Sequence, residues 1–171
     1  MSQQHVVTFI GDDRTGLVEQ VAKVIEKHGG NWLESQLSHL GGKFAGIILV
    51  SLPEEQAENL ADALTHLPEG KWSVRVTPTL DSTAQAAANL TIDIIGPDRP
   101  GIVREVSAAL RDARINILEL ESLVESAAFT GEPVFKANVV AAMPGDIDQL
   151  QLEATLDQIA ENMTLEIDIK S

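Results

Sequence analysis

The stretch Gly11-Asp12-Asp13-Arg14-Thr15-Gly16-Leu17-Val18 recurs 85 positions later as Gly96-Pro97-Asp98-Arg99-Pro100-Gly101-Ile102-Val103. The same displacement brings the apolar positions of the next segment into register and places Asn31 on Asn116. Chance rarely preserves register over such a length, and self-similarity at a fixed period is the signature of a repeat. The chain therefore contains an internal duplication, and we expect two domains.

Each copy begins with a short apolar run rich in β-branched residues, Val6 to Ile10 in the first and Leu90 to Ile95 in the second, which predicts a strand. The quoted loop ends this strand, because Gly and Pro interrupt regular structure. Apolar residues then recur at the spacing of one helix face, which predicts an amphipathic helix. The positions are Leu17, Val18, Val21, Val24 and Ile25 in the first copy, and Ile102, Val103, Val106, Ala109 and Leu110 in the second.

Two further strands, a second helix and a closing strand follow in each copy. The expected strands are Trp32 to Leu40, Phe44 to Leu52 and Trp72 to Thr77, then Asn116 to Val124, Val134 to Met143 and Leu165 to Ile169. In the first copy the second helix is expected to begin at Pro53-Glu54-Glu55, with a core stripe of Ala57, Leu60, Ala61, Leu64 and Leu67. In the second copy it is expected to run from about Asp146 to Asn162. Each half thus reads β-α-β-β-α-β, the split pattern of the ferredoxin-like α+β fold, with antiparallel sheets and both helices on one face.

The open face of such a sheet must be covered or stay polar, so we expect pairing between halves or between chains, and a homodimer is one form of it. The stretch from Pro78 to Asn89 is typical of a linker. We assign residues 1–80 to an N-terminal domain, 81–89 to the linker and 90–171 to a C-terminal domain.

Composition limits the choice of partners. The 171 residues include 12 basic and 26 acidic side chains, a net charge of −14, and no cysteine. Excess carboxylates oppose binding to DNA phosphates and to anionic membranes. Neither a long apolar window nor a signal-peptide pattern is present, and disulfides are impossible, so we expect a cytoplasmic protein without a membrane partner.

The repeated loop has the chemistry of an anion site. A glycine at a helix start leaves backbone N–H groups open to a carboxylate or a phosphate. The amides of Asn31 and Asn116 offer a donor and an acceptor together. We expect them near the first loop, where a small zwitterion would bridge the two.

Structural roles remain open for the same residues. Asp13 and Asp98 are also candidate helix caps, whereas Gly16 and Gly101 are candidates for close packing and Pro100 for presetting φ. Both arginines also fit surface ion pairs, and both asparagines fit turns. Sequence alone leaves these alternatives standing.

The loop motif G-x-D-R-x-G-[IL]-V, followed by Gly29-Gly30-Asn31 or Ile115-Asn116, resembles the ACT domain, a module that senses amino acids. Two copies over nearly the whole chain resemble the glycine cleavage system transcriptional repressor family, and Leu40-Gly41-Gly42-Lys43-Phe44 strengthens that likeness.

This resemblance implies an effector, glycine or serine first, bound at an interface between ACT domains, and a partner protein that carries the DNA-binding function. It implies no cofactor. The matching positions are Asp12, Asp13, Arg14, Thr15, Gly16 and Asn31 in the first copy, and Asp98, Arg99, Pro100, Gly101 and Asn116 in the second. Two departures put one copy's site in doubt: Thr15 stands where the second copy has proline, and Ala113-Arg114-Ile115 replaces a glycine-rich helix end.

No catalytic motif emerges from the sequence. The four histidines form no metal-binding pair, cysteine ligands are lacking, and neither a nucleophile elbow nor a phosphate-binding loop is present. We therefore predict a non-enzymatic regulator without a metal site. The alternatives are a regulatory subunit of an amino-acid biosynthetic enzyme, an acylphosphatase-type enzyme in which Arg14 and Asn31 converge on a phosphate, and a scaffold that binds no ligand.

Overall fold

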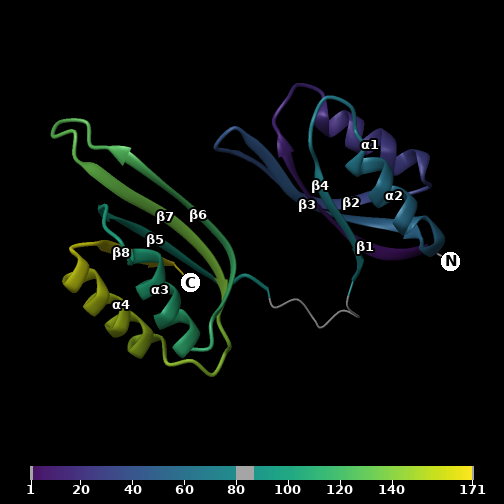
Figure 1. Cartoon of the computed structure of the whole chain (residues 1–171). Coiled ribbons are helices and arrows are strands. Elements are labelled where there is room, and N and C mark those ends of the chain that lie inside the picture. The colour runs from purple at the N-terminus through teal and green to yellow at the C-terminus, as the bar shows by residue number, and fades with distance from the viewer. Residues whose placement is uncertain (1, 80–86, 171) are drawn as a thin grey trace. The chain divides into compact units, whose positions relative to one another are not determined.

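Each half of the chain forms β-α-β-β-α-β in the computed structural model, which describes residues 2–79 and 87–170 (Figure 1). The chain divides into two compact units, Met1–Thr83 and Ala84–Ser171. Residues 81–86 of the expected linker lie outside the described residues. At its far end, Asn89 donates its backbone N–H to the carbonyl of Ala141 and its side-chain amide to that of Met143.

The first unit is a four-stranded antiparallel sheet in the order β2-β3-β1-β4. Its elements are β1 (Ser2–Asp12), α1 (Leu17–Lys27), β2 (Asn31–Leu40), β3 (Lys43–Pro53), the 3-10 helix η1 (Glu54–Gln56), α2 (Ala57–Thr65) and β4 (Ser73–Pro78). The strongly apolar segment of residues 43–53 is an inner strand. The second helix starts later than expected, because its first turn, residues 54–56, is the 3-10 turn η1.

The second unit repeats this order as β6-β7-β5-β8, also antiparallel. Its elements are β5 (Leu90–Pro97), α3 (Ile102–Asp112), β6 (Asn116–Ser126), β7 (Pro133–Ala142), α4 (Gln149–Met163) and β8 (Glu166–Lys170). The predicted fold class, two ferredoxin-like domains with antiparallel sheets, is confirmed.

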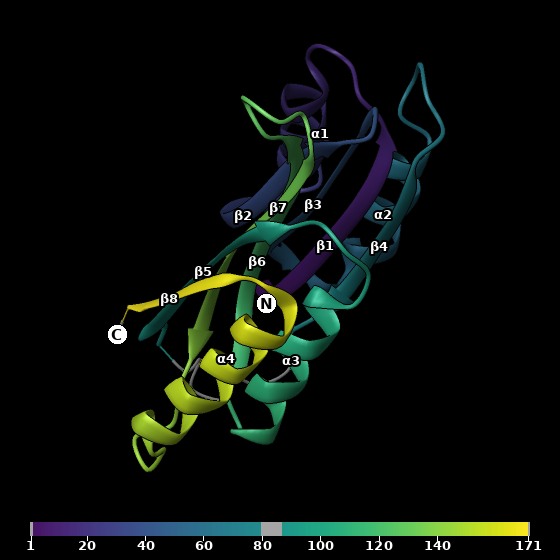
Figure 2. The same cartoon turned by 90° about the vertical axis from the view of Figure 1, so that its left-hand side faces the viewer.

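In each unit the two helices cover one face of the sheet (Figures 1 and 2). Successive strand residues point to opposite faces, so along β1 the buried Val7 and Phe9 alternate with the exposed Thr8 and Ile10. The first core contains Val7, Ile48, Val50 and Leu52 from the strands and Leu17, Val21, Ile25, Leu60 and Leu64 from the helices. The second contains Ile92, Val139, Ala141, Ile102, Val106, Leu110, Leu152 and Leu156 in the same arrangement.

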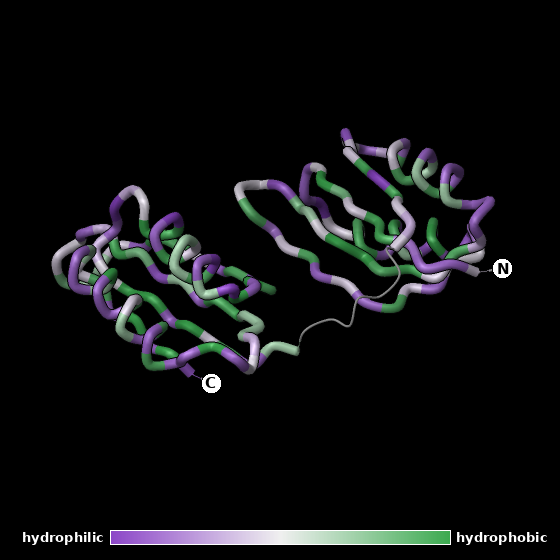
Figure 3. Tube along the Cα trace, turned by 90° about the horizontal axis from the view of Figure 1, so that it is seen from below, coloured by the Kyte–Doolittle hydropathy of each residue, from purple (hydrophilic) through white to green (hydrophobic). Residues whose placement is uncertain are grey.

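Hydrophobic and hydrophilic residues alternate within the turns of the helices, as amphipathic elements require (Figure 3). Within the predicted stripe of the first helix, one position in each copy is wrong: Val18 and Val103 are 43% and 44% exposed. Each follows the first core residue of its helix directly, and a step of about 100° per residue turns it away from the sheet. In the second helix of the first copy, the predicted stripe residue Leu67 is buried but lies beyond the end of α2 at Thr65.

Helix α3 ends as α1 does, although it lacks the glycine. Gly29 has φ 74°, and Arg114 takes the same left-handed conformation with φ 59° at the equivalent position. The closing hydrogen bonds also match: Gly30 N–H to Ile25 O, and Ile115 N–H to Leu110 O, both 2.9 Å. The departure at residues 113–115 therefore leaves the helix end intact.

Candidate functional site

Both repeated loops end on a glycine in the left-handed conformation. Gly16 is the N-cap of α1 with φ 82°, and Gly101 is the N-cap of α3 with φ 101°. Within the described part of the chain, no side chain caps either helix start. The first-turn N–H groups therefore receive no side-chain acceptor there, and the positive end of the helix dipole favours an anion.

Two of the structural alternatives are wrong. Asp13 and Asp98 do not cap the helices, because the N-caps are the glycines three residues later. Close packing does not explain Gly16 either, since among the described residues no atom lies within 4 Å of a Cβ built there. The glycines are needed for positive φ, which L side chains rarely adopt.

Thr15 and Pro100 are exposed and precede the same left-handed glycine. The replacement of proline by threonine in the first copy therefore leaves the helix start unchanged.

Each loop is fixed to the hairpin between the second and third strands of its unit. The Asp13 backbone N–H donates to the carbonyl of Gly42 at 3.3 Å, and that of Asp98 donates to the carbonyl of Pro133 at 2.9 Å. Side chains add contacts in the first unit, where Asp12 forms an ion pair with Lys43 and the Asp13 carboxylate lies 3.6 Å from His39 Nε2. These contacts tie both loops, and the carboxylates of the first, to the hairpins of their units.

Arg14 is largely buried, with 15% of its side chain exposed, so it is not a surface residue. Its guanidinium donates to Gln20 and, at 2.9 Å, to the carbonyl of Pro68. Glu69 lies 3.6 Å away, and the guanidinium carbon is 5.9 Å from the centroid of the Trp72 ring. Arg14 therefore connects the loop to the segment between α2 and β4, a role that the sequence did not indicate.

Two buried N–H donors lie in this cluster. Arg14 Nε and Trp72 Nε1 have no hydrogen-bond acceptor among the described residues. Buried donors without acceptors carry a free-energy penalty of roughly 1–3 kcal/mol each. In the second unit the equivalent Arg99 instead donates to the hydroxyl of Thr164 at 3.3 Å, and Leu165 follows where the first unit has tryptophan.

The expectation that the asparagines lie near the loops of their own copy is wrong. Asn31 pairs with Ser51, which pairs with Gln4, eight residues before Asp12 in β1. At about 3.3 Å per residue, the asparagine and the loop are roughly 26 Å apart at opposite ends of the sheet. In the second copy Asn116 pairs with Ala142, again at the end away from Asp98.

The same separation removes the basis for acylphosphatase-type chemistry. That interpretation needs the side chains of Arg14 and Asn31 to converge on one phosphate. The register places them at opposite ends of the first sheet, and the guanidinium already bonds within the protein.

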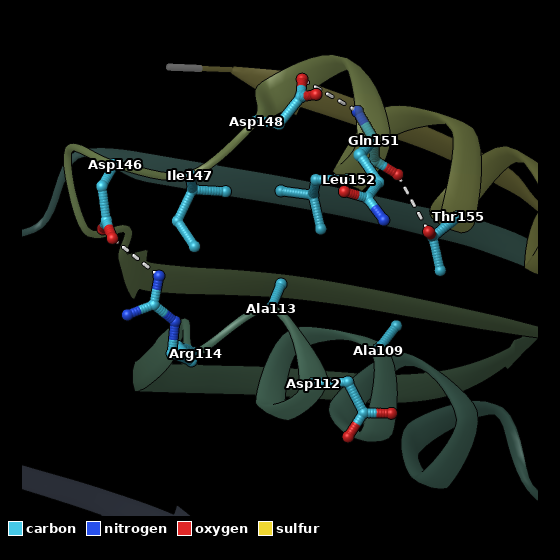
Figure 4. Close-up of a pocket in the computed structure, with 10 residues that line it drawn as sticks. All are labelled: Ala109, Asp112, Ala113, Arg114, Asp146, Ile147, Asp148, Gln151, Leu152 and Thr155. Atoms are coloured by element: carbon cyan, nitrogen blue, oxygen red, sulfur yellow. Dashed lines mark hydrogen bonds and ion pairs between the residues drawn. The ribbon is translucent and has the colours of Figure 1, made fainter.

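The described part of the second unit contains hollows of different sizes. One, of about 530 Å³, is bordered by Asp98 and by Thr130, Thr164 and Glu166, so it lies beside the second loop. Another, of about 380 Å³, lies between the end of α3 and the start of α4 and contains none of the predicted site residues (Figure 4). There Arg114 donates to Asp146 at 2.7 Å, and this bond lowers the pKa of the Asp146 carboxyl.

Over residues 2–79 and 87–170, no three His, Asp or Glu side chains gather closely enough to hold a metal ion. None of the helices described is long and apolar enough to cross a membrane.

The chain is a tandem arrangement of two small βαββαβ modules, each with a left-handed glycine at the start of its first helix. The model of the ACT domain matches residues 3–72 and again residues 89–170, so the chain belongs to the ACT domain family. Among curated proteins, the glycine cleavage system transcriptional repressors of Escherichia coli K12 and Shigella flexneri are each 24% identical over 158 residues, covering 90% of this chain and 83% of the relative.

Solved structures also match over the full length. An unknown protein from Galdieria sulphuraria is 28% identical with a TM-score of 0.87, covering 99% of this chain and 98% of that one. A crystal structure of a candidate glycine cleavage system transcriptional repressor is 16% identical with a TM-score of 0.72, covering 99% and 97%. Because the second structure is only 16% identical in sequence, its similarity shows a shared fold alone.

Proposed function

We propose that this chain is a non-enzymatic regulator that binds a small amino acid, glycine or serine first, at its helix-start loops. The observation that carries the proposal is the left-handed glycine that opens α1 and α3 without a side-chain cap from any described residue. Such a start favours an α-carboxylate. Membership of the ACT family and relatives named as transcriptional repressors support a regulatory role.

The loop also offers a partner for the ammonium group of an amino acid. The carboxylates of Asp13 and Asp98 lie three residues before the N-cap glycines, so one zwitterion can use both charges of the loop. Arg14 and Arg99 position the loops through Pro68 and Thr164. The proposed site comprises Asp12, Asp13, Arg14, Thr15 and Gly16, and in the second copy Asp98, Arg99, Pro100 and Gly101.

Asn31 and Asn116 enter this proposal in a different way. Neither amide reaches a ligand held by the loop of its own domain, because the sheet separates them by roughly 26 Å in the first copy. Each asparagine contributes to an effector site only if the loop at that site belongs to another ACT domain.

Titration calorimetry with glycine, serine and a panel of larger amino acids tests the binding. Asp13→Asn and Asp98→Asn remove one ammonium partner each, and loss of a charge-assisted hydrogen bond weakens binding by about ten- to a hundredfold. We expect this loss in the variant whose copy binds. Asp157→Asn, on the exposed side of α4, is the matched control and keeps the wild-type affinity.

The absence of both heat and any shift in melting temperature at millimolar ligand contradicts the sensor proposal. Equal affinities for wild type and both loop variants contradict the placement of the site.

We further propose that regulation proceeds by contact with a DNA-binding protein. The charge of −14 disfavours direct contact with DNA phosphates. A tagged chain used to capture partners with and without glycine, followed by mass spectrometry, tests this. Capture of an amino-acid biosynthetic enzyme instead indicates a regulatory subunit, and salt-sensitive binding of the purified chain to DNA contradicts the indirect mechanism.

A further inference from the structure

The two sheets differ on the face opposite their helices. In the first unit, the inner strands place Val6, Thr8 and Ile10 of β1 in register with Leu49, Ile47 and Ala45 of β3 on that face. We call these six residues the apolar face. Ile10 and Ile47 are 48% and 52% exposed, and Val6, Ala45 and Leu49 are partly exposed, which leaves apolar surface on the two inner strands.

In the second copy two of the six equivalent positions are charged, Asp93 and Lys136. Its inner strands present Thr91, Asp93 and Ile95 beside Val140, Asn138 and Lys136. Asp93 accepts hydrogen bonds from Asn138 at 2.6 Å and Lys170 at 2.7 Å. The edge strands add carboxylates to this face: Glu119, Glu121, Glu166 and Asp168 stand in register with these residues, and Glu125 stands in register with Val134. The duplicated faces have thus diverged: one is apolar and the other is acidic.

We propose that the apolar face is an interface with the same face of a second copy of the chain. Two stacked sheets pack about 10 Å apart when their inner faces are apolar. An acidic surface is a poor cover for the apolar face, because carboxylates lose water on contact with apolar side chains. An anionic lipid surface is disfavoured by the net charge of −14.

The charge distribution also selects this half of the chain for self-association. Residues 2–79 carry six basic and ten acidic side chains, whereas residues 87–170 carry six basic and fifteen acidic ones. Two copies therefore repel each other less through the first unit than through the second.

The edges of the apolar face are self-complementary. Glu34 of β2 stands in register with Leu49, and Arg75 of β4 stands in register with Thr8. These are the two opposite edge strands of the sheet. A two-fold axis parallel to the strands stacks β2 of one copy on β4 of its partner. Glu34 then lies close to the partner's Arg75, displaced from it by two residues along the strands. The mutual arrangement forms two such pairs around the apolar centre.

The dimensions of the sheet set the strength of this contact. Four strands spaced by about 4.8 Å and eight residues rising about 3.3 Å each give a patch of roughly 19 Å by 26 Å. About 500 Å² per copy is below the roughly 800 Å² per partner of a standard stable interface. The dimer should therefore dissociate in the micromolar range or above.

Sedimentation velocity across roughly 1–300 μM of the full chain tests the proposal. We expect a concentration-dependent dimer that Ile10→Lys weakens at least tenfold, because the change buries two like charges across the axis. Ile95→Lys is the matched control: it lies at the equivalent position of the acidic face, is 39% exposed, and should leave dimerisation unchanged.

Exchanging the charges of Glu34 and Arg75 tests the relative orientation of the two copies and leaves the hydrophobic core of the unit unchanged. Glu34→Arg alone should weaken the dimer, and the double variant Glu34→Arg/Arg75→Glu should restore it. A chain that stays monomeric over this range, an Ile10→Lys variant that dimerises like wild type, or a double variant that fails to restore binding overturns the proposal. Amino-acid calorimetry is independent of all three readouts, so failure here leaves the proposed function standing.

Discussion

Gly16 and Gly101 hold the backbone conformation on which both helix starts depend. We expect Gly16→Ala to destabilise the first unit by about 1–2 kcal/mol, because an L residue with positive φ brings its Cβ close to the following carbonyl. Among the described residues no atom lies within 4 Å of a Cβ built at Gly16, so steric clashes with neighbours add little to this destabilisation. Urea unfolding followed by circular dichroism measures the change.

Gly145→Ala is the control for this substitution. Among the described residues no atom lies within 4 Å of its added Cβ, and its φ is not positive. The variant should be as stable as wild type or slightly more so, since alanine reduces the freedom of the unfolded chain. Equal stability of both alanine variants would mean that the left-handed conformation does not determine the helix start.

At the scale of elements, the two helices of the second unit begin in different ways. Helix α3 starts at a bare glycine, whereas α4 starts at Asp148, whose carboxylate accepts hydrogen bonds from Leu150 N–H at 3.0 Å and Gln151 N–H at 3.3 Å. An N-cap of this type contributes about 1 kcal/mol. The contrast is between a helix start that receives side-chain hydrogen bonds from Asp148 and one that receives none from any described residue.

Asp148→Ala should therefore lower the free energy of unfolding by about 1 kcal/mol and leave amino-acid binding unchanged. Thermal and urea unfolding measure the first effect and calorimetry the second. Asp157→Ala, within the same helix, should be neutral because alanine suits a helix interior. If Asp148→Ala abolished amino-acid binding in a folded chain, the effector site would lie at α4 and the hollow of Figure 4 instead of the repeated loops.

At the scale of the whole molecule, the acidic second half makes stability depend on pH. Hydrogen bonds from Lys170 and Asn138 hold the pKa of the Asp93 carboxyl below its usual value. A carboxyl whose pKa is lowered by folding stabilises the folded state above its unfolded pKa of about 3.9, and this contribution is lost as pH falls through the folded pKa.

We expect Asp93→Asn to be less stable than wild type at pH 7, with the difference shrinking as the pH is lowered below about 4. Urea midpoints at several pH values measure this convergence. Asp157→Asn, which lacks these partners in the described structure, should track wild type. A gap between Asp93→Asn and wild type that stays constant with pH would show that the pairing with Lys170 does not stabilise the fold.

The order of strands and helices could be predicted from the sequence because it depends on local patterns. Period-2 and helical spacing of apolar residues, together with the glycines at 11 and 16, specify the elements one after another. The sequence was an incomplete guide where contacts between residues in space determine the exposure of a side chain or the conformation of the backbone. Val18 satisfies the helical spacing but faces solvent, and Arg114 replaces a helix-ending glycine because its left-handed backbone is held by bonds to α3.

By itself the sequence determined the duplication, the two βαββαβ units and the resemblance to ACT domains, since all three are read from residues near one another in the chain. Only the tertiary structure decided that Arg14 is buried against Trp72 and that Asn31 lies at the far end of the sheet from its own loop. It also separated the apolar face of the first sheet from the acidic face of the second. These features depend on strand order and register, which bring together residues that no local pattern connects.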